Sequence, residues 1–450
     1  MSESTTGIQI RWDLPRAGFL ALAAGLPLIL LAVHAGLGHQ GDLRWFYEWA
    51  YEVSASPAFY RRDPMINYPI IGVLVLWLPA WLWEHVAGQE MDFTTYRLVV
   101  KGTLALVEIG FVLVVSAAAR ALGILRPRLF AICLYALPAI WAGGAWFGQI
   151  DVVGSSLLLL AAWGAVRYAL AYRESALGWL TLALLGLLGA VLTKQLTLFS
   201  VPGVLLMIAL GVGMRWQRYY LRRAVVATAI VACSPVALLL PDVVLTLPDG
   251  YRSHLAYVLL GGGSAHGDVL SGNGANVWAW LSSDPSAPST TIVFAGLSAK
   301  QVGVILFCAV QLALLGWLAL EARQLGRVDR SVKSRLRETL GSYTLYLGMS
   351  NLAMATLLTG VHERYLYCGV PFLLLGLALR LRSWGRLGWW LTSAAWIVCG
   401  WSGLFVLSSI HWNTFGGVLA PFRSHTVTGM LELGLLVTLL VAILSKIRVR

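Results

Sequence analysis

The segment YPIIGVLVLWLPAWLWEHV, residues 68–86, decides the topology of this chain. It is apolar and long enough to cross a membrane as a helix. Its prolines, Pro69 and Pro79, and its three tryptophans also suit a helix that lies along the membrane surface, at the level of the lipid headgroups. Every later loop changes side according to whether this segment crosses, so its placement fixes the orientation of the rest of the protein.

The remainder of the chain repeats the same apolar pattern. Of its 450 residues, 58% are hydrophobic and only 12% are charged, about half the charged fraction of a soluble domain. Apolar runs of about 20 residues without strand alternation predict membrane-spanning helices, because a helix satisfies its own backbone hydrogen bonds in lipid. Thirteen runs lie near 17–36, 69–87, 97–119, 129–147, 152–171, 176–193, 196–213, 223–241, 301–320, 341–360, 366–380, 387–408 and 428–446.

Basic clusters favour one placement of residues 69–87, because lysine and arginine concentrate in cytoplasmic loops. If this run lies on the outer surface, 23 of the 33 lysine and arginine residues fall on the cytoplasmic side. If the run crosses, every later cluster moves outside. These clusters are Arg11/Arg16, Arg120/Arg126/Arg128, Arg167/Arg173, Arg215/Arg218/Arg222/Arg223, Arg323 to Arg337, Arg380/Arg382/Arg386 and Lys446/Arg448/Arg450.

We therefore expect an all-α polytopic membrane protein with about twelve transmembrane helices and an interfacial helix over 69–87. The first apolar stretch, Ala17 to Ala35, has no small-residue cleavage site after it and is expected to remain as the first helix. The whole chain, 1–450, is expected to form one membrane domain with both ends in the cytoplasm. Its chemistry is expected in the long outer loops, 39–95, 241–300 and 409–427, where unusual polar residues accumulate.

Composition also narrows the classes of partner and cofactor. The net charge of +12 is distributed as topology determinants, so no nucleic-acid partner is expected. The five cysteines are odd in number and lack metal-ligand spacing, which predicts buried, inert thiols without a disulfide framework. The eight histidines are scattered without paired spacing. We predict no metal site and no cofactor.

Asp42, in GDLRWFYEWA (41–50), is the strongest candidate for a catalytic residue. A carboxylate at the mouth of a helical bundle can act as a general base when it is hydrogen-bonded and partly desolvated. The structural alternative is that Asp42 caps an interfacial helix. The absence of an Asp-x-Asp pair in this loop argues against metal-dependent chemistry, and Glu48 and Asp63 are alternative bases.

Two further polar stretches interrupt apolar runs on the expected outer face. In WFGQIDVV (146–153), Gln149 and Asp151 stand inside some forty apolar residues, where a charge is costly unless it has a function or a partner. Asp151 can instead cap the next helix. In LTKQLTLFSVPG (192–203), Lys194 and Gln195 can hold a lipid phosphate or a sugar hydroxyl. A snorkelling lysine at the membrane surface is the alternative.

The stretch TGVHERYLYCGVPF (359–372) carries His362, Glu363 and Arg364 in succession, followed by Tyr365. Arg364 can hold a phosphate through two hydrogen bonds, and His362 can donate to a phosphate or move a proton. A structural hinge held by Glu363 and Arg364 is the competing hypothesis. The pattern is not a zinc motif, because no second histidine follows four residues after His362.

The loop 241–300 contains LSGNGANVWAWLSS (270–283), which is rich in Gly, Ser and Asn. Such a loop can cover a cleft or bind an acceptor. Asn273, Asn276 and Trp278 are its candidate functional residues.

Together these stretches resemble the GT-C superfamily of integral-membrane glycosyltransferases, and most closely the polyprenyl-phosphate-mannose-dependent mannosyltransferases. The resemblance covers about residues 39–372. It departs from the family in two motifs: the family often has NYPP or HPP where this chain has Asn67-Tyr68-Pro69-Ile70, and KPQ where this chain has Lys194-Gln195. Asp42 also lacks the adjacent carboxylate that many members have. The matching features are, in order, Asp42 in GDLRWFYEWA, NYP (67–69) opening the 69–87 helix, GQ-x-D (148–151), TKQ (193–195) and HERYLY (362–367), with NGANVW as a further similar stretch.

This resemblance implies transfer of a single sugar from a polyprenyl-phosphate-linked donor to a lipid, glycan or protein acceptor, with inversion and without metal. Asp42 would deprotonate the acceptor hydroxyl, and Asp151 or Gln149 would orient sugar hydroxyls. Mannose is the expected sugar, and membrane lipids are the further partners. Lys194, His362 and Arg364 would surround the departing phosphate, while Gln195, Glu363 and Tyr365 complete the expected substrate-binding set.

The expected location is a prokaryotic cell membrane, with the active site facing outside.

Two other functional classes remain open. A lipid-linked-sugar flippase or transporter would share the helix count, but it should show paired inverted halves, and no such internal symmetry is evident. A non-catalytic subunit of a polysaccharide assembly complex would tolerate loss of Asp42, whereas an enzyme would not.

Overall fold

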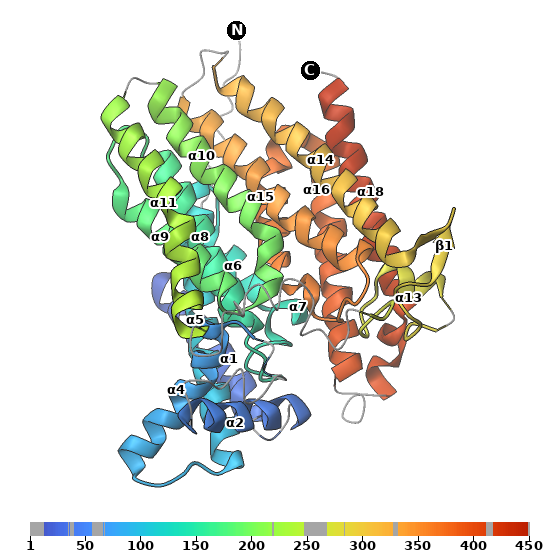
Figure 1. Cartoon of the computed structure of the whole chain (residues 1–450). Helices are drawn as coiled ribbons and strands as arrows, with labels where there is room; N and C mark the ends of the chain where they lie inside the picture. The colour runs from blue at the N-terminus through green and yellow to red at the C-terminus, as the bar shows by residue number, and fades with distance from the viewer. Residues whose placement is uncertain are drawn as a thin grey trace.

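The computed structural model describes residues 13–34, 36, 40–55, 66, 68–217, 220–246, 268–282, 284–326, 332–410 and 417–448. These residues form a bundle of long helices that lie side by side, with shorter elements gathered at its lower end in Figure 1. The helices and strands in chain order are α1 (Arg16–His34), α2 (Gln40–Ala55), α4 (Ile70–Ala87), α5 (Phe93–Leu122), α6 (Pro127–Tyr135), α7 (Pro138–Trp141), α8 (Asp151–Leu170), α9 (Leu177–Val191), η1 (Gln195–Ser200), α10 (Val201–Gln217), α11 (Leu221–Thr246), α13 (Val277–Leu281), β1 (Ile292–Phe294), β2 (Leu297–Ser298), α14 (Ala299–Arg323), η3 (Gln324–Gly326), α15 (Val332–Leu357), η4 (Tyr365–Cys368), α16 (Val370–Ile410), η5 (Ala420–Arg423) and α18 (His425–Arg448).

Within the described residues, eight helical stretches are long and apolar enough to cross a membrane. The chain is therefore a helical membrane protein of the multi-pass class, as the sequence predicted, while twelve spans remain a prediction. The eight stretches are Arg16–Val33, Ile70–Ala87, Phe93–Leu122, Asp151–Leu170, Leu196–Gln217, Ala299–Arg323, Ser383–Ser409 and His425–Ser445.

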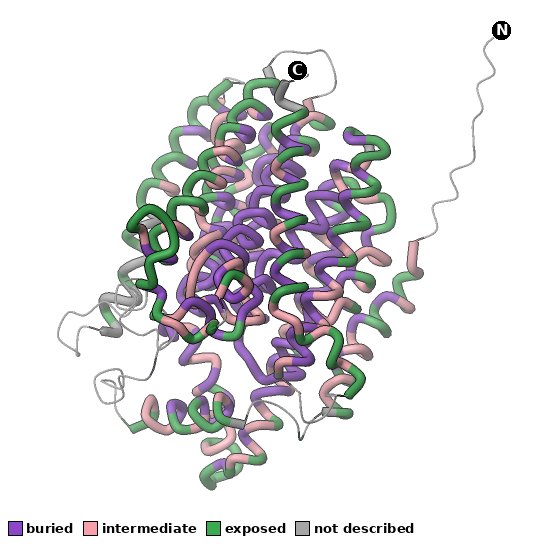
Figure 2. The backbone as a smooth tube through the Cα atoms, turned by 90° about the vertical axis from the view of Figure 1, so that its right-hand side faces the viewer, coloured by how far each residue is buried: buried purple, intermediate pink, exposed green. Residues whose placement is uncertain are grey.

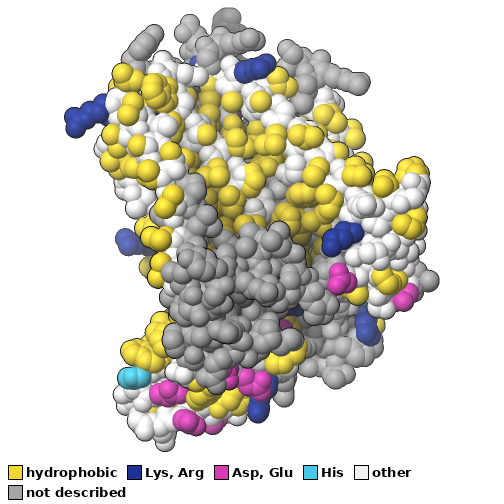
Figure 3. All heavy atoms as spheres, viewed as in Figure 1, with side chains coloured by type: hydrophobic (Ala, Val, Ile, Leu, Met, Phe, Trp, Pro, Cys, Tyr) yellow, Lys and Arg dark blue, Asp and Glu magenta, His cyan; other side chains and the backbone are white. Residues whose placement is uncertain are grey.

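The outer surfaces of the helices are apolar, as lipid contact requires. Leu106, Leu312 and Ile397 are each about two-thirds exposed although they lie in the middle of long helices (65%, 70% and 67%). Figure 2 shows the buried backbone in the interior and exposed positions along the outer helices. In the view of Figure 3, hydrophobic side chains cover the upper part of the bundle, and the acidic side chains visible on this face lie near its lower end and on the lobe at the right. A water-soluble protein rarely exposes apolar patches of this size.

The prediction that all cysteines are buried is wrong for three of the five. Cys133, Cys233 and Cys308 are exposed, whereas Cys368 and Cys399 are buried, and all five are free thiols. The physical reason is that lipid, and not water, surrounds membrane helices. An apolar position in a membrane helix can face lipid, so apolar sequence surroundings do not predict burial inside the protein.

The core lies along α8 and α15. Every side chain of α15 from Thr339 to Leu357 is buried, so this helix is surrounded by others on all sides. Its mixed composition includes polar residues that pair with neighbouring elements: Asn351 Nδ2 donates to Ser200 Oγ (2.7 Å) and Ser350 Oγ donates to the Phe199 carbonyl (3.1 Å). These contacts hold α15 against η1, which lies beside the functional site described below.

The apolar run 129–147 does not form the continuous spanning helix that the sequence predicted. It forms α6 and α7, of nine and four residues, followed by turns up to residue 150. Pro138 has no N–H to continue the helix and begins α7 at its first position, and Gly148 adopts a positive φ of 88°. Such irregular backbone is tolerated at membrane depth only where protein encloses it. Residues 142–150 are all buried.

Helix α4 contains most of the run 69–87, which the distribution of basic residues predicts to lie on the membrane surface. It is one of the eight helices long and apolar enough to cross a membrane, and it contains Pro79 and ends at Gly88 in the left-handed conformation. Figure 1 shows it beside α2 at the lower end of the molecule. An interfacial position for α4 stays a prediction.

The basic clusters and the polar motifs lie at opposite ends of the helices. Asp151 begins α8 and Arg167 lies in its last turn, so at 1.5 Å per residue about 24 Å separate them along the helix. Arg380 lies ten residues after the start of α16, shortly before a kink at Gly385 (φ 58°). The two predicted runs 366–380 and 387–408 lie on either side of this kink. Asp151 and the two arginines therefore lie toward opposite ends of the bundle, and which end faces the cytoplasm stays a prediction.

Candidate functional site

Five segments that are distant in sequence meet at one end of the bundle. They are the first turn of α2, the residue pair before α4, the turn between α7 and α8, the turn between α9 and η1, and the loop before η4. The side chains that meet there are Asp42, Tyr68, Gln149, Asp151, Lys194, His362, Glu363 and Arg364.

Asp42 is held by Gln149. It lies in the first turn of α2 and is half-buried, and its Oδ2 accepts a hydrogen bond from Nε2 of the fully buried Gln149. Gln149 in turn accepts from the Tyr68 hydroxyl through Oε1, at 3.1 Å. Asp42 is the third residue of α2 and not its N-cap, so the predicted capping role does not describe its position. A half-buried, hydrogen-bonded carboxylate has the environment that a general base needs.

Tyr68 links this carboxylate to the buried cation Lys194. Lys194 Nζ donates to the Tyr68 hydroxyl at 2.9 Å and lies 4.1 Å from the centre of its ring. Asp151 Oδ1 lies 3.3 Å from the same Nζ, and both charged side chains are almost fully buried. The prediction of a snorkelling lysine is therefore wrong, because Lys194 points into the protein toward a carboxylate.

Asp151 lies between two cations. Besides Lys194, it faces Arg364, whose Nε is 3.5 Å from Asp151 Oδ2. It is also the first residue of α8, where a negative charge is favoured by the helix dipole. Neither carboxylate oxygen accepts a hydrogen bond from the described part of the chain, although both are buried. A buried carboxylate with unused acceptor capacity is unusual and often marks a binding site.

Arg364 joins Asp151 to a second buried carboxylate, Glu363. Its NH1 lies 2.8 Å from Glu363 Oε1, while His362 Nδ1 lies 3.7 Å from Glu363 Oε2. Asn273 Nδ2 donates to the same Oε2 at 3.4 Å. The Glu363–Arg364 pair required by the hinge hypothesis exists, but Arg364 also faces Asp151, so the loop does more than close a hinge.

Glu363, Lys194 and Arg364 keep their charges in this cluster. Burial alone would raise the pKa of Glu363, but the neighbouring charges of Arg364 and His362 lower it to about 2. Burial alone would lower the pKa of Lys194, but Asp151 and Tyr68 raise it above its usual range. The same balance raises the pKa of Arg364, through Glu363 and Asp151. The site therefore holds two permanent positive charges inside the protein.

Tyr365, a predicted site residue, lies at the margin of the site. Burial raises the pKa of Tyr365 to about 12, so its hydroxyl is neutral, and its ring lies 5.2 Å from that of His362. Gln195 begins η1, but its side chain lies outside the described set. Of the alternative bases, Glu48 is exposed and pairs with Arg44 at 3.1 Å. Asp63 lies outside the described residues.

The start of α4 is fastened to the turn that carries Lys194. The N–H groups of Ile71 and Gly72 both donate to the Leu192 carbonyl, at 2.8 and 3.1 Å. A side chain at Gly72 would collide with the Thr193 carbonyl oxygen, so only glycine allows this approach. The contact brings Tyr68, two residues before α4, beside Lys194.

Glu108 fixes the turn that carries Gln149 and Asp151, a role that the sequence analysis missed. This fully buried carboxylate of α5 accepts hydrogen bonds from the Tyr135 hydroxyl and from the Ala145 N–H (2.8 Å). The approach depends on Gly144, where any side chain would collide with the Glu108 carboxylate. The available signal was that Glu108 is the only acidic residue in the apolar run 97–119, and such residues are rarely without a partner.

The loop 268–282 lies against the edge of the site. Gly272 and Gly274 both donate through their N–H groups to the Val361 carbonyl, at 3.0 and 2.9 Å. Asn276 caps α13 and Trp278 Nε1 donates to the Leu357 carbonyl at 2.7 Å, so these two candidates anchor the loop. Asn273 alone of the three reaches the charged cluster, between Glu363 and His425.

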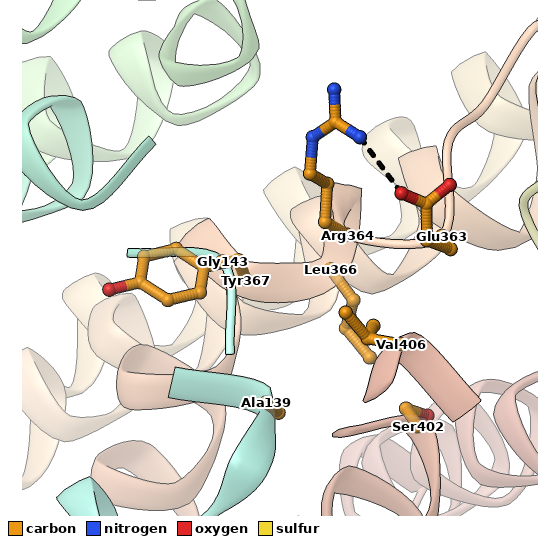
Figure 4. Close-up of a pocket in the computed structure, with 8 residues that line it drawn as sticks. All are labelled: Ala139, Gly143, Glu363, Arg364, Leu366, Tyr367, Ser402 and Val406. Carbon is orange, nitrogen blue, oxygen red and sulfur yellow. Dashed lines mark hydrogen bonds and ion pairs between the residues drawn. The ribbon is translucent and has the colours of Figure 1, made fainter. Parts of the chain in front are cut away.

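A narrow, mostly apolar cavity lies beside the charged cluster (Figure 4). In this view the side chains of Glu363 and Arg364 point away from the apolar residues that line the rest of it. The lining residues are Ala139, Gly143, Glu363, Arg364, Leu366, Tyr367, Ser402 and Val406. Glu363 and Arg364 therefore lie where the charged cluster meets an apolar surface.

Within the described residues, no group of three His, Cys, Asp or Glu side chains has the geometry to hold a metal ion. The arrangement instead offers a hydrogen-bonded carboxylate, Asp42, linked through Gln149 and Tyr68 to the buried cation Lys194. A base and a buried positive charge in one network suit proton abstraction together with stabilisation of a developing anion. Comparison of the chain with protein-family models, with curated proteins and with solved structures found no match.

Proposed function

We propose that this protein is a membrane glycosyltransferase that moves a single sugar, with mannose the expected one, from a polyprenyl-phosphate donor to a lipid, glycan or protein acceptor. The reaction inverts the anomeric centre, needs no metal and takes place on the non-cytoplasmic face. One observation carries the proposal. An unbroken series of polar contacts runs from Asp42 through Gln149, Tyr68, Lys194 and Asp151 to Arg364 and Glu363 at one end of a membrane bundle.

Asp42 is the proton acceptor in this scheme. It takes the proton of an acceptor hydroxyl while that oxygen forms a bond to the anomeric carbon, and the bond between this carbon and the phosphate oxygen breaks. The phosphate leaves with the electron pair. The Gln149 amide fixes the Asp42 carboxylate, which reduces the entropy cost of bringing base and acceptor together.

Lys194 and Arg364 stabilise the departing phosphate. Their charges are fixed in place before reaction, inside the protein, where an electrostatic interaction is stronger than in water. Asp151 lies between them with two buried oxygens that accept no hydrogen bond from the described residues. These oxygens are suited to bind sugar hydroxyls.

The flippase and scaffold hypotheses fit a multi-pass fold equally well. The connected network of several charged side chains at one end of the bundle, against a single ion pair near the other end, favours chemistry at one membrane face over passage through the bilayer.

The proposal is tested with purified protein, polyprenyl-phosphate-mannose and a lipid extract as the acceptor source, in EDTA. The expected result is a mannosylated product that forms at the same rate with and without EDTA. Glucose, galactose and arabinose donors in parallel reactions identify the sugar. Measurable donor binding without transfer from any of these donors would contradict the proposal and favour a flippase or a scaffold.

A further inference from the structure

A small hairpin outside the candidate site carries an unusual exposed surface. Strands β1 and β2 pair antiparallel through Ile292–Ser298 and Phe294–Leu297 and are joined by Ala295 and Gly296. Both joining residues have positive φ, 46° and 80°, which produces a tight turn. Ile292, Val293 and Phe294 are 62%, 45% and 70% exposed.

Neither face of β1 is covered by the described part of the protein. Successive side chains of a strand point to opposite faces, so Ile292 and Phe294 lie on one face and Val293 on the other, and all three are exposed. Exposed strands in water usually carry charges that keep them soluble. Here residues 285–299 contain no charged side chain. The hairpin therefore has the composition of a surface that is removed from water.

The hairpin is firmly attached to the beginning of a candidate spanning helix. Thr291 accepts from the Ala299 N–H (2.9 Å) and Ser289 accepts from the Lys300 N–H (3.0 Å), through their carbonyls. Ser298 and Gln301 form a capping box at the start of α14. The hairpin cannot move far from the membrane boundary, because α14 is a candidate span from Ala299 onward.

Near the start of α14, Val304, Ile305 and Leu306 are also about half exposed (47%, 54% and 43%), so the candidate span beside the hairpin has apolar side chains open to its surroundings. Figure 1 shows β1 projecting sideways from the bundle beside the start of α14. In Figure 3, hydrophobic side chains cover the upper part of the projecting lobe at the right, and charged side chains lie below them. The apolar tip thus lies toward the apolar part of the bundle.

We propose that the hairpin 291–298 inserts its apolar tip into the headgroup region of the lipid bilayer, at the membrane face where α14 begins. Insertion is shallow, because a two-stranded hairpin leaves backbone groups unpaired and these groups are costly in the hydrocarbon core. The lipid is the occupant, and the inference does not depend on the proposed enzyme activity.

Insertion also positions the loop that borders the candidate site. The segment before the hairpin pairs with this loop through Ser289 N–H to the Asp268 carbonyl (2.7 Å) and Leu270 N–H to the Ala287 carbonyl (2.9 Å). The same loop contacts Val361 through Gly272. Anchoring the hairpin in lipid therefore holds the loop against His362 and Glu363.

The test uses the full chain in lipid nanodiscs, with Cys133, Cys233 and Cys308 replaced by alanine and an environment-sensitive NBD dye attached at Phe294→Cys. The matched control carries the dye at Ser286→Cys, an exposed position before the hairpin. Val293→Cys serves as a second tip position if the first variant does not fold. Quenching is measured with lipids spin-labelled near the headgroup, with lipids spin-labelled deep in the acyl chain, and with aqueous iodide.

The expected result is that the tip dye is quenched several-fold more by the shallow spin label than the control dye, and is protected from iodide. The deep label should quench it less than the shallow one. Equal iodide quenching at both positions would overturn the proposal, because the tip would then face water. A tip dye shielded from both lipid and iodide would also overturn it, because protein, such as a second copy of this chain, would then cover the tip.

Discussion

Two buried charge clusters, one near each end of the bundle, are built differently. At the end carrying the basic clusters, Arg380 lies 2.7 Å from Glu321 and donates to Ser342, joining α14, α15 and α16. At the other end, the closest cation atoms to Asp151 are 3.3 and 3.5 Å away, and its oxygens accept no hydrogen bond from the described residues.

The difference separates a structural ion pair from a site prepared for a ligand. A single close pair satisfies its charges and ties helices together, so we expect Arg380 and Glu321 to matter for folding. A carboxylate between two cations with unused acceptor capacity has not completed its interactions. We expect the cluster around Asp151 to complete them with substrate.

The two clusters should differ most in their effect on transfer activity when one carboxylate is removed from each. Asp151→Asn and Glu321→Gln each leave buried positive charge unpaired, which costs about 3–5 kcal/mol of stability. Only Asp151→Asn should also abolish transfer per folded molecule. Thermal unfolding and turnover are measured on the same preparations, and loss of turnover in folded Glu321→Gln protein would contradict the distinction.

Arginine substitutions test the same difference between the two clusters through their effect on donor affinity. Arg364→Ala should weaken binding of the polyprenyl-phosphate donor by about ten- to a hundredfold, the effect of one lost charged hydrogen bond. Arg380→Ala should leave the affinity of the folded protein unchanged. Titration calorimetry with the intact donor provides the measurement, and an unchanged affinity in Arg364→Ala would remove this residue from the phosphate site.

Gly72→Ala should act at the site through backbone geometry. The added methyl group would collide with the Thr193 carbonyl oxygen, so α4 and Tyr68 must shift away from Lys194, at a cost of about 1–3 kcal/mol. We expect a lower kcat together with this loss of stability. Gly102→Ala in α5 is the control, because a methyl group there meets open space. Equal kinetics in the two variants would argue against the docking role of Gly72.

The smallest effect is expected from acid titration of Glu363. Its pKa is lowered to about 2 in the folded protein, below the value of about 4.3 in an unfolded chain. Its contribution to stability is therefore complete above the unfolded pKa and is lost as the pH falls from about 4.3 toward 2. The difference in unfolding temperature between wild type and Glu363→Gln should stay constant from pH 7 to pH 5 and shrink below that. A difference that already shrinks near pH 6 would show that Glu363 is not held ionised by Arg364.

The sequence predicted much of the fold because long apolar runs have few alternatives in lipid. The runs 97–119, 152–171, 301–320 and 428–446 form α5, α8, α14 and α18. Run 129–147 failed as one helix because Pro138 and the glycines after it break the helix where protein encloses the backbone. Hydropathy does not distinguish such an enclosed break from a span.

The candidate site was predicted in part, since Asp42, Asp151, Lys194 and Arg364 were each conspicuous as polar residues in apolar surroundings. Their partners were not predictable. Tyr68 connects Asp42 to Lys194 through Gln149 only because α4 docks on the turn after α9. Such contacts between residues far apart in sequence depend on the tertiary packing and leave no local pattern.

In the proposed reaction, Asp42 is the base of a site completed by Lys194 and Arg364. The most direct measurement compares transfer rate and donor affinity for wild type, Asp42→Asn and Glu48→Gln, the last being an exposed carboxylate on the same helix. Asp42→Asn should lose at least about a hundredfold in transfer rate while donor affinity and unfolding temperature stay unchanged, and Glu48→Gln should behave as wild type. Retained transfer in Asp42→Asn would contradict the claim and move the base to Glu48, Asp63 or Asp151.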